Sequence, residues 1–187
     1  AFNETLTQEF TPDWADEVWA INMASNIVWH DVVFWLDDLV QQHAFRPRLI
    51  EALRKRDKPV ITSKAYRDLV PKSYDYPIQE VALIAIPYFN KPYLNNGVAM
   101  AIAYAIWKGV KTLKIYGADF TYPNRDYAES GRACVEAWIA IACFKGVNIA
   151  LCQNTSLIDL VKDHGIYGYA EQPTIVLPDG REWQYKK

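Results

Sequence analysis

Short apolar runs alternate with helix-like segments along most of the chain, and this alternation constrains the fold more than any other feature. The runs are continuously apolar, which is typical of strands buried on both faces of a parallel sheet. We expect strands over 17–22, 31–35, 58–63, 79–86, 111–117 and 147–152. We expect helices over 46–56, 95–109, 130–146 and 155–165. The sequence therefore predicts an α/β fold: a doubly wound parallel sheet with helices on both faces.

The two ends of the chain depart from this pattern. Residues 1–16 form an irregular, loop-like start, whereas a doubly wound fold begins with a strand. We expect either that the first βα unit has been lost or that the sequence begins inside a longer gene. Residues 172–187 hold two strand-like halves around Pro178-Asp179-Gly180, which predicts an appended C-terminal β-hairpin. With 187 residues and no clear linker, a single domain over 1–187 is the simplest prediction.

Charge and hydropathy exclude several classes of partner. The net charge is −2 and no Lys/Arg-rich stripe is present, so we expect no nucleic-acid partner. No apolar run reaches the roughly 18–20 residues of a membrane span. We therefore expect no membrane span and, without a secretory signal at the start, a cytoplasmic protein.

Metal and cofactor motifs are also missing from the sequence. The three cysteines and three histidines lack the close spacing of metal ligands, so we expect no metal site. No glycine-rich phosphate loop and no nucleophile elbow is present. These absences argue against a standard NAD enzyme, a P-loop ATPase or an α/β-hydrolase, and we expect no cofactor.

Polar residues follow the predicted strands, where parallel sheets bind their ligands. Because the carboxyl ends of parallel strands share one edge, we expect these side chains to converge on a single rim. The candidates after the strands, and at the start of the helix over 95–109, are Asn22, Thr62, Ser63, Asn95, Asn96, Gly97, Asp119, Thr121, Tyr122, Tyr127 and Glu129.

Each candidate has a structural alternative. Asn95-Asn96-Gly97 presents a helix N-terminus to a ligand, or else supplies an ordinary Asn cap. Asp119 binds a sugar hydroxyl, or else holds an Asx-type turn. Tyr122 and Tyr127 stack on a base or hold a phosphate, or else pack against the protein. These alternatives stay open from the sequence.

Acidic residues near two helix starts also permit two interpretations. Glu129, Arg132 and Glu136 share one helical stripe, and Arg132–Glu136 is the expected structural ion pair. Glu129 lies nearer the rim. It acts there as a base, or else it is an ordinary first-turn Glu that the helix dipole stabilises. Asp37-Asp38 resembles the metal-binding carboxylates of nucleotide-sugar transferases, or caps the next helix.

Longer motifs carry a resemblance to known families. The stretch "NNGVAMAIAYAIWKGVKTLKIYGADFTYPN" (95–124) is remotely similar to Rossmann-like family 42 sialyltransferases and motility accessory factor-type glycosyltransferase-like domains. The motifs "VWAIN", "HDVVFWLDD", "GADFTYPN", "ESGRACVEAW" and "TSLIDL" resemble uncharacterised phage-encoded Rossmann-like proteins, over roughly residues 15–165. The resemblance implies a Rossmann-like fold and glycosyltransferase-like activity.

The sialyltransferase resemblance also implies roles for individual residues. Asn96-Gly97 correspond to the Ser-Gly that touches the nucleotide sugar, and Asn22 to an Asn that contacts the nucleotide. Tyr127 corresponds to a Tyr that holds the departing phosphate. Tyr122 is one position from a second such Tyr, where Thr121 stands instead.

The sequence departs from the family at one important place. Glu129 occupies the position of the family's catalytic His. Sialyl transfer by the family's route is therefore in doubt, although a Glu can act as a general base.

These observations lead to a first functional hypothesis with open alternatives. The chain is expected to be a glycosyltransferase-like protein that binds a nucleotide sugar. Glu129 and Asp119 are the candidate catalytic residues, and Arg132 is a candidate nucleotide- or sugar-binding residue. The alternatives are a nucleotide- or sugar-binding module without turnover, a phage or host interaction protein, and a nucleoside-processing hydrolase or transferase. Whether the chain is an enzyme stays open. The aromatic content of 14% and the appended hairpin permit a homodimer.

Overall fold

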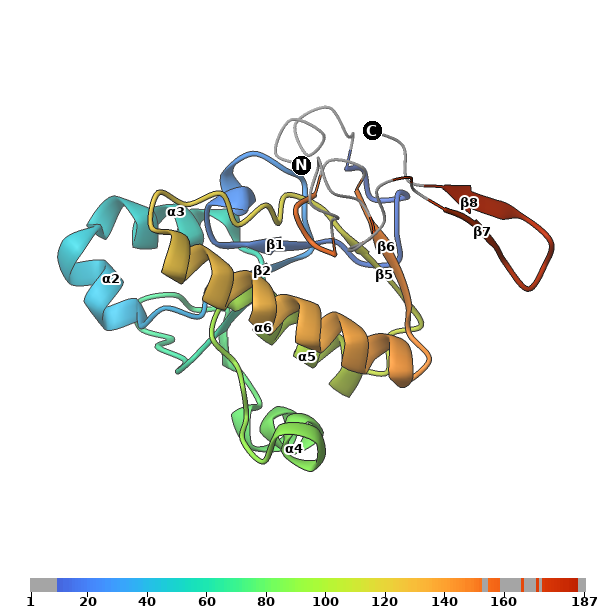
Figure 1. Cartoon of the computed structure of the whole chain (residues 1–187). Helices are drawn as coiled ribbons and strands as arrows, with labels where there is room; N and C mark the ends of the chain where they lie inside the picture. Colours follow the sequence, from blue (N-terminus) through green and yellow to red (C-terminus); the bar gives the residue numbers. More distant parts are fainter. Residues whose placement is uncertain (1–9, 153–154, 159–165, 167–170, 172, 185–187) are drawn as a thin grey trace. The chain divides into compact units, whose positions relative to one another are not determined.

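The structure is a computed structural model that describes residues 10–152, 155–158, 166, 171 and 173–184. It is a mixed α/β structure that contains a four-stranded parallel sheet (Figure 1). The chain separates into two compact units, Ala1–Leu157 and Ile158–Lys187, and each is described by itself.

The strands of the first unit form two parallel sheets. Four strands pair in the order in which they follow along the chain: β1 (Trp19–Ile21), β2 (Val32–Phe34), β3 (Val60–Thr62) and β4 (Ser73–Asp75). The other sheet pairs β5 (Thr112–Ile115) with β6 (Asn148–Leu151). Ile21 lies opposite Phe34, and Phe34 lies opposite Ile61. The carboxyl ends of β1, β2 and β3 therefore reach the same edge.

Helices pack on both faces of the four-stranded sheet. The described helices are η1 (Asn22–Asn26), α2 (Leu39–Phe45), α3 (Pro47–Arg56), α4 (Ile78–Phe89), α5 (Gly97–Trp107) and α6 (Arg125–Phe144). Val33 and Val60 pack with buried residues of α2 and α3, whereas Phe34 joins the core with α5 and α6. Because neighbouring strand residues point to opposite faces, both faces must be apolar. This explains the continuous apolar runs in the sequence.

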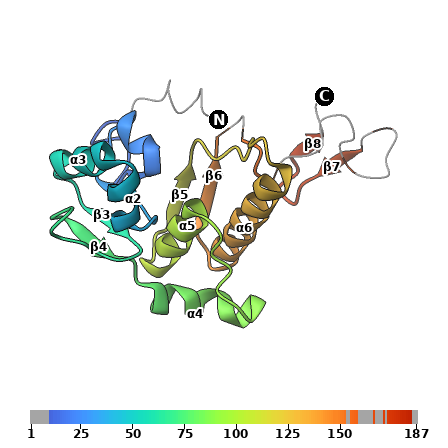
Figure 2. The same cartoon turned by 90° about the vertical axis from the view of Figure 1, so that its left-hand side faces the viewer.

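The larger core lies under α5 and α6, which run side by side (Figure 2). Trp138 of α6 is fully buried, and the small residues Ala99 and Ala103 of α5 are also fully buried. Leu113 of β5 and Ile149 of β6 pack against the same core. The nearly all-round apolar character of α5 in the sequence follows from this burial.

The predicted strand over 79–86 is wrong, because these residues form part of helix α4. An apolar run of this length fits either a strand or a buried helix, and its periodicity alone does not decide between them. The buried residues Val81 and Ala85 are one helical turn apart, and Pro87 lies in the last turn. Strand β4 was not predicted, since only one residue of its short sequence, Ser73, is buried.

Helix α6 begins five residues before the predicted start at 130. Its first residue is Arg125, and the Asn124 side chain accepts a hydrogen bond from the backbone N–H of Tyr127 at 3.1 Å. Asn is among the preferred N-cap residues. Tyr127 therefore lies in the first turn of a helix and not in the loop before it, and Glu129 lies one turn further into the helix than predicted.

The second unit contains two paired strands. β7 (Thr174–Val176) pairs antiparallel with β8 (Glu182–Gln184), with Thr174 opposite Gln184. Between them, Gly180 has a φ of 83°, which favours glycine. Residues 172 and 185–187 of the predicted hairpin and residues 159–165 of the predicted helix lie outside the described residues. None of the helices in the described part of the chain combines the length and the apolar character that a membrane crossing requires.

Candidate functional site

A small pocket lies where β1 and β2 end and α5 begins. Its volume is about 160 Å³, and it is lined by Asn22, Leu36, Asp37, Leu94, Asn95, Asn96, Gly97 and Met100. Asn22 is the first residue after β1, and Asp37 lies three residues after β2. Four of the residues selected from the sequence thus meet at this carboxyl edge. We call this space the edge pocket.

The backbone at Asn22 has an uncommon conformation. Its φ is 50°, in the left-handed region that Asn adopts more readily than most other residues. Its carbonyl oxygen accepts a hydrogen bond from the Ser25 hydroxyl at 2.8 Å. The Arg56 guanidinium, at the end of α3, donates to Ser25 Oγ at 2.7 Å and also to Asn26 Oδ1. Residues distant in sequence therefore fix the turn that presents Asn22.

Asn96 uses both ends of its side-chain amide within the protein. Its Oδ1 accepts from the backbone N–H of Ala99 at 2.9 Å, which caps α5. Its Nδ2 donates to the carbonyl oxygen of Gly131 in α6 at 3.0 Å. The structure therefore assigns Asn96 the capping role, together with a tether between α5 and α6.

The loop before α5 is fastened to α6 by further hydrogen bonds. The carbonyl oxygen of Tyr93 accepts from Trp138 Nε1 at 2.7 Å and from the Cys134 thiol at 3.2 Å. The N–H of Asn95 lies 3.4 Å from Cys134 Sγ. Burial raises the pKa of the Cys134 thiol, so the thiol keeps the proton that it donates. The wall of the edge pocket is thus held from the core side.

Asp37 and Asp38 separate into two roles. Asp38 caps α2, because its Oδ1 accepts from the N–H of Gln41 at 2.9 Å. Asp37 is exposed and lines the edge pocket, and within the described part of the chain it has no hydrogen bond or ion pair. The sequence permitted either Asp37 or Asp38 to cap α2, and in the structure Asp38 does so. Asp37 leaves a carboxylate facing the start of α5.

The edge pocket combines acceptors and donors of hydrogen bonds. Asp37 supplies carboxylate oxygens, and the first-turn N–H groups of Gly97 and Val98 have no intrahelical acceptor. Among the described residues that line the pocket, none is Lys or Arg. A carboxylate near the helix start repels an anion but accepts hydrogen bonds from hydroxyl groups. The pocket chemistry therefore suits a neutral, hydroxyl-bearing group better than a phosphate.

Strained backbone gathers in the loops of this edge. Six described residues other than glycine have a clearly positive φ: Asn22, Asp57, Asn90, Tyr93, Phe120 and Ile158. Asp57 and Asn90 end helices, where this conformation is ordinary. Asn22, Tyr93 and Phe120 lie in the loops that follow β1, precede α5 and follow β5. Non-glycine residues held in this way cluster at functional sites in proteins.

The loop after β5 is held by the loop after β6. Thr155 Oγ1 donates to the carbonyl oxygen of Ala118 at 2.8 Å, and the Ser156 hydroxyl donates to the carbonyl oxygen of Asp119. Asp119 is half-buried. These contacts give the hydroxyl residues that follow β6 a structural role.

Two tyrosines form an exposed aromatic pair at the start of α6. Tyr122 and Tyr127 are 52% and 64% exposed, and their ring centroids are 5.5 Å apart. Phe120 extends the group, with its centroid 6.2 Å from that of Tyr122. Phe120 also packs on Gly131, the residue to which Asn96 is tethered. Exposed aromatic faces of this kind can stack on a base or a sugar ring.

Glu129 and Arg132 do not line the edge pocket. Glu129 is exposed and shares an outward stripe of α6 with the exposed residues Ala133 and Ala140. Arg132 Nε lies 4.0 Å from Glu136 Oε1, with both side chains partly exposed. This is the ion pair that the sequence predicted, and exposed pairs of this kind stabilise a helix only slightly.

Thr62, Ser63 and Thr121 also lie outside the lining of the edge pocket. Thr62 is fully buried, and its Oγ1 finds no hydrogen-bond partner among the described residues. The sequence could not show this burial, because Thr62 is the last residue of β3 and the next residue, Ser63, is already exposed. Thr121 is exposed in the loop after β5.

The site that sequence reasoning assembled is therefore divided. Asn22, Asn95, Asn96 and Gly97 share the edge pocket, while Tyr122 and Tyr127 form a separate aromatic pair at the start of α6. Asp37 completes the pocket, and its position three residues after β2 is the signal that could have placed it with the other edge residues. Within the described residues, no three His, Cys, Asp or Glu side chains are grouped closely enough to hold a metal ion.

Comparison with known proteins identifies no relative: no protein-family model, no curated protein and no solved structure matches this chain.

Proposed function

We propose that the chain binds a nucleotide or a nucleotide sugar in the edge pocket, on a Rossmann-like, glycosyltransferase-like fold. The observation that carries this proposal is the convergence of Asn22, Asp37 and the start of α5 on one pocket at the carboxyl ends of two parallel strands. Open parallel sheets bind their ligands at such an edge.

The strand order supports the location of the pocket. β2, β3 and β4 extend the sheet in one direction from β1. In a doubly wound sheet, β5 would lie on the other side of β1, so the order would reverse beside β1. A Cβ atom on Gly97 would lie 3.4 Å from Ile21 Cγ2, so α5 starts next to the end of β1. In that arrangement the edge pocket would lie at the switch point.

The charge of the pocket specifies which part of the ligand enters it. Asp37 accepts hydrogen bonds from two neighbouring hydroxyl groups of a ribose or a sugar, and the N–H of Gly97 donates to a hydroxyl oxygen. The phosphate stays outside, because no cationic side chain lines the pocket and a carboxylate does. Tyr122 and Tyr127 offer a surface on which a base can stack.

Turnover would require a base near the bound sugar. In a glycosyltransferase reaction Glu129 takes the proton of the acceptor hydroxyl, the acceptor oxygen bonds to the anomeric carbon, and the nucleotide leaves with the bonding electrons. Glu129 lies on the outward stripe of α6 and not in the pocket lining. This position favours the second candidate, a nucleotide- or sugar-binding module without turnover.

Ligand binding tests the proposal directly. Thermal unfolding of the full chain is followed with millimolar CMP, UDP, GDP, the matching ribonucleosides and their 2′-deoxy forms. A ligand that binds only the folded state raises the melting temperature. We expect a rise with at least one ribonucleoside or nucleotide and a smaller rise with its deoxy form. If no compound changes the melting temperature, the edge pocket does not bind nucleotides.

Two variants locate the binding in the edge pocket. Asp37→Asn removes the charge of the acceptor, and Asp37→Ala removes the acceptor altogether. Each is expected to raise the dissociation constant about tenfold or more, since a lost charge-assisted hydrogen bond costs about 1.5–3 kcal/mol. Asp68→Asn, at an exposed Asp outside the pocket, is the matched control and should leave binding unchanged.

One further variant separates the enzyme from the binding module. Glu129→Gln should abolish turnover and keep binding if the protein is a glycosyltransferase. A wild-type protein that binds the nucleotide sugar but neither transfers nor hydrolyses the sugar is a module.

A further inference from the structure

Helix α4 exposes an unusual amount of apolar surface. Its sequence, IQEVALIAIPYF, is apolar on nearly every face, yet only Val81 and Ala85 are buried. Leu83 is 63% exposed, and Ile86 and Tyr88 are 40% and 44% exposed. A helix that is apolar all round is normally buried on all sides. The first unit of the chain covers only one side of α4.

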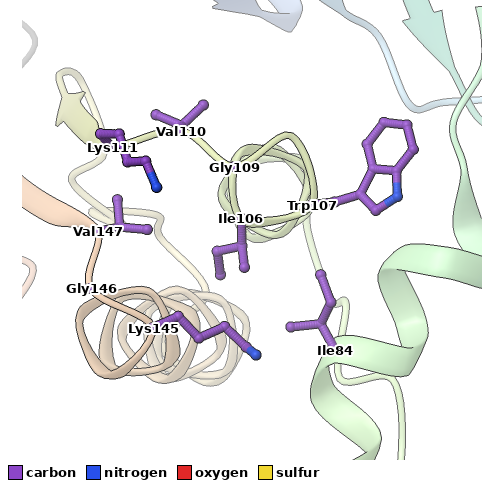
Figure 3. Close-up of a pocket in the computed structure, with 9 residues that line it drawn as sticks. All are labelled: Ile84, Ile106, Trp107, Gly109, Val110, Lys111, Lys145, Gly146 and Val147. Carbon is purple, nitrogen blue, oxygen red and sulfur yellow. The ribbon is translucent and has the colours of Figure 1, made fainter.

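An apolar pocket opens next to this helix. Its volume is about 440 Å³, and it is lined by Ile84, Ile106, Trp107, Gly109, Val110, Lys111, Lys145, Gly146 and Val147. Figure 3 shows the side chains of Ile84, Ile106 and Lys145 directed into the same space, from α4, from α5 and from the end of α6. The pocket lies at the carboxyl ends of α5 and α6, whereas the edge pocket lies at the start of α5. It therefore has no part in the proposed nucleotide site.

Further exposed aromatic residues border this pocket. Phe144, the last residue of α6, is 78% exposed, and its ring centroid lies 6.0 Å from that of Tyr88. Trp107, the last residue of α5, is 43% exposed. We call Leu83, Ile84, Tyr88, Trp107 and Phe144 the α4 surface.

The size of the α4 surface suits a protein partner. Four of its side chains are large and more than two-fifths exposed, so together they offer an apolar area on the order of a few hundred Å². The largest apolar patch on a typical monomer is about 300–600 Å², and a stable interface buries about 800 Å² per partner. The exposed apolar side chains of the α4 surface are comparable to such a patch, and an interface of standard size would also include polar residues around them.

The surface is also complementary to itself. Leu83 projects from α4 beside an apolar pocket that a side chain of its size can enter. Glu80 lies one turn before Leu83 and Ile84 on the same side of α4, it is exposed, and it makes no ion pair within the described residues. Lys111 and Lys145 line the pocket. An interface with two-fold symmetry requires that one surface carries both the projection and its recess, and both charges.

We propose that two copies of this chain associate through the α4 surface. Leu83 of each copy enters the pocket of the other, and Glu80 of each copy approaches Lys145 of the other. The aromatic residues Tyr88, Trp107 and Phe144 surround the contact and exclude water. Such buried aromatic groups carry much of the binding energy at interfaces.

Molar mass in solution tests the dimer. Light scattering after gel filtration and sedimentation of the full chain are measured from low to high micromolar concentration, and we expect the dimer mass. Leu83→Lys and Phe144→Ser are each expected to raise the dimer dissociation constant at least about tenfold. Phe45→Ser is the matched control, because Phe45 is also the last residue of a helix and is 83% exposed. It should leave the dimer unchanged.

A charge exchange tests the pairing. Glu80→Lys and Lys145→Glu should each weaken the dimer, and the variant that combines them should restore it, with unfolding temperatures confirming that all variants fold. A monomeric wild-type protein over the whole concentration range overturns the proposal. So does a dimer that Leu83→Lys and Phe144→Ser leave intact, or a combined charge variant no stronger than the single variants.

Discussion

At the scale of single residues, close contacts decide which side chains the site tolerates. A Cβ atom on Gly131 would lie 2.9 Å from Phe120 Cε1, closer than side chains normally approach. Gly131 also carries the carbonyl oxygen that receives the Asn96 tether. Because Gly131 of α6 has no side chain, Phe120 of the loop after β5 and Asn96 at the start of α5 can both contact α6 at this position.

Gly131→Ala tests this close contact. The added methyl group should push the Phe120 ring aside and destabilise the fold by about 1–3 kcal/mol, despite the better helix propensity of Ala. Urea unfolding measures the change. Phe120→Leu in the same chain should recover part of the loss, and Ser130→Ala at the exposed neighbour should cost little. Equal stabilities of Gly131→Ala and the wild type would show that the contact is not tight.

Asp37 and its neighbour Asp38 show how one step along the chain separates a pocket residue from a helix cap. Asp37 and Asp38 have identical side chains, but among the described residues only Asp38 accepts a hydrogen bond from a backbone N–H group. The carboxylate at 37 is left facing the start of α5, where the helix dipole favours it. The charge that the proposed ligand must accommodate is thus set by the geometry of one turn after β2.

At the scale of elements, the start of α5 depends on α6. Asn96 caps its own helix and donates to α6, while Cys134 and Trp138 hold the carbonyl oxygen of Tyr93. No residue of α6 is among those that line the edge pocket, but α6 holds the loop before α5 that forms part of its wall.

The two functions of Asn96 can be measured separately. Asn96→Ser keeps a capping oxygen and loses the tether to Gly131, whereas Asn96→Ala loses both. We expect the free energy of unfolding to fall from wild type to Asn96→Ser and again to Asn96→Ala, with each step about 0.5–2 kcal/mol. Chemical denaturation gives the order. If the Ser and Ala variants are equally stable, the cap contributes nothing.

At the scale of the whole molecule, burial controls how the fold responds to pH. His30 is buried before β2, and its Nδ1 lies 2.9 Å from the carbonyl oxygen of Val28, which requires an N–H at that position. Its Nε2 has no hydrogen-bond partner within the described residues. Burial lowers the pKa of His30 below its ordinary value of 6.5, so the folded protein holds the neutral form.

Acid should therefore weaken the fold through His30. Above pH 6.5 both states hold a neutral His30, and this contribution to stability is complete. Below pH 6.5 the unfolded chain binds a proton that the folded chain resists, so the free energy of unfolding falls until the lowered pKa is passed. Urea unfolding between pH 7.5 and pH 5 measures this slope. His30→Asn should reduce it, whereas His43→Asn, at an exposed helical position, should not.

Sequence by itself determined the class of the fold and the edge where polar residues collect. Strands β1, β2, β3, β5 and β6 fall within predicted runs. The runs of β1, β2 and β3 are largely apolar because their sheet is covered on both faces. In β5 and β6, exposed and half-buried residues alternate instead. Asn22, Asn95, Asn96 and Gly97 could be selected because parallel strands end at a common edge.

Tertiary structure decided the features that the hydrophobic pattern of the sequence could not determine. The run over 79–86 becomes a helix because one side of it packs against α5, and Thr62 is buried because β3 lies inside the sheet. Asn124 starts α6 early enough to place Glu129 on an outward stripe, away from the edge pocket. Local sequence fixes the period of a segment, but the direction of each side chain depends on neighbours that are distant along the chain.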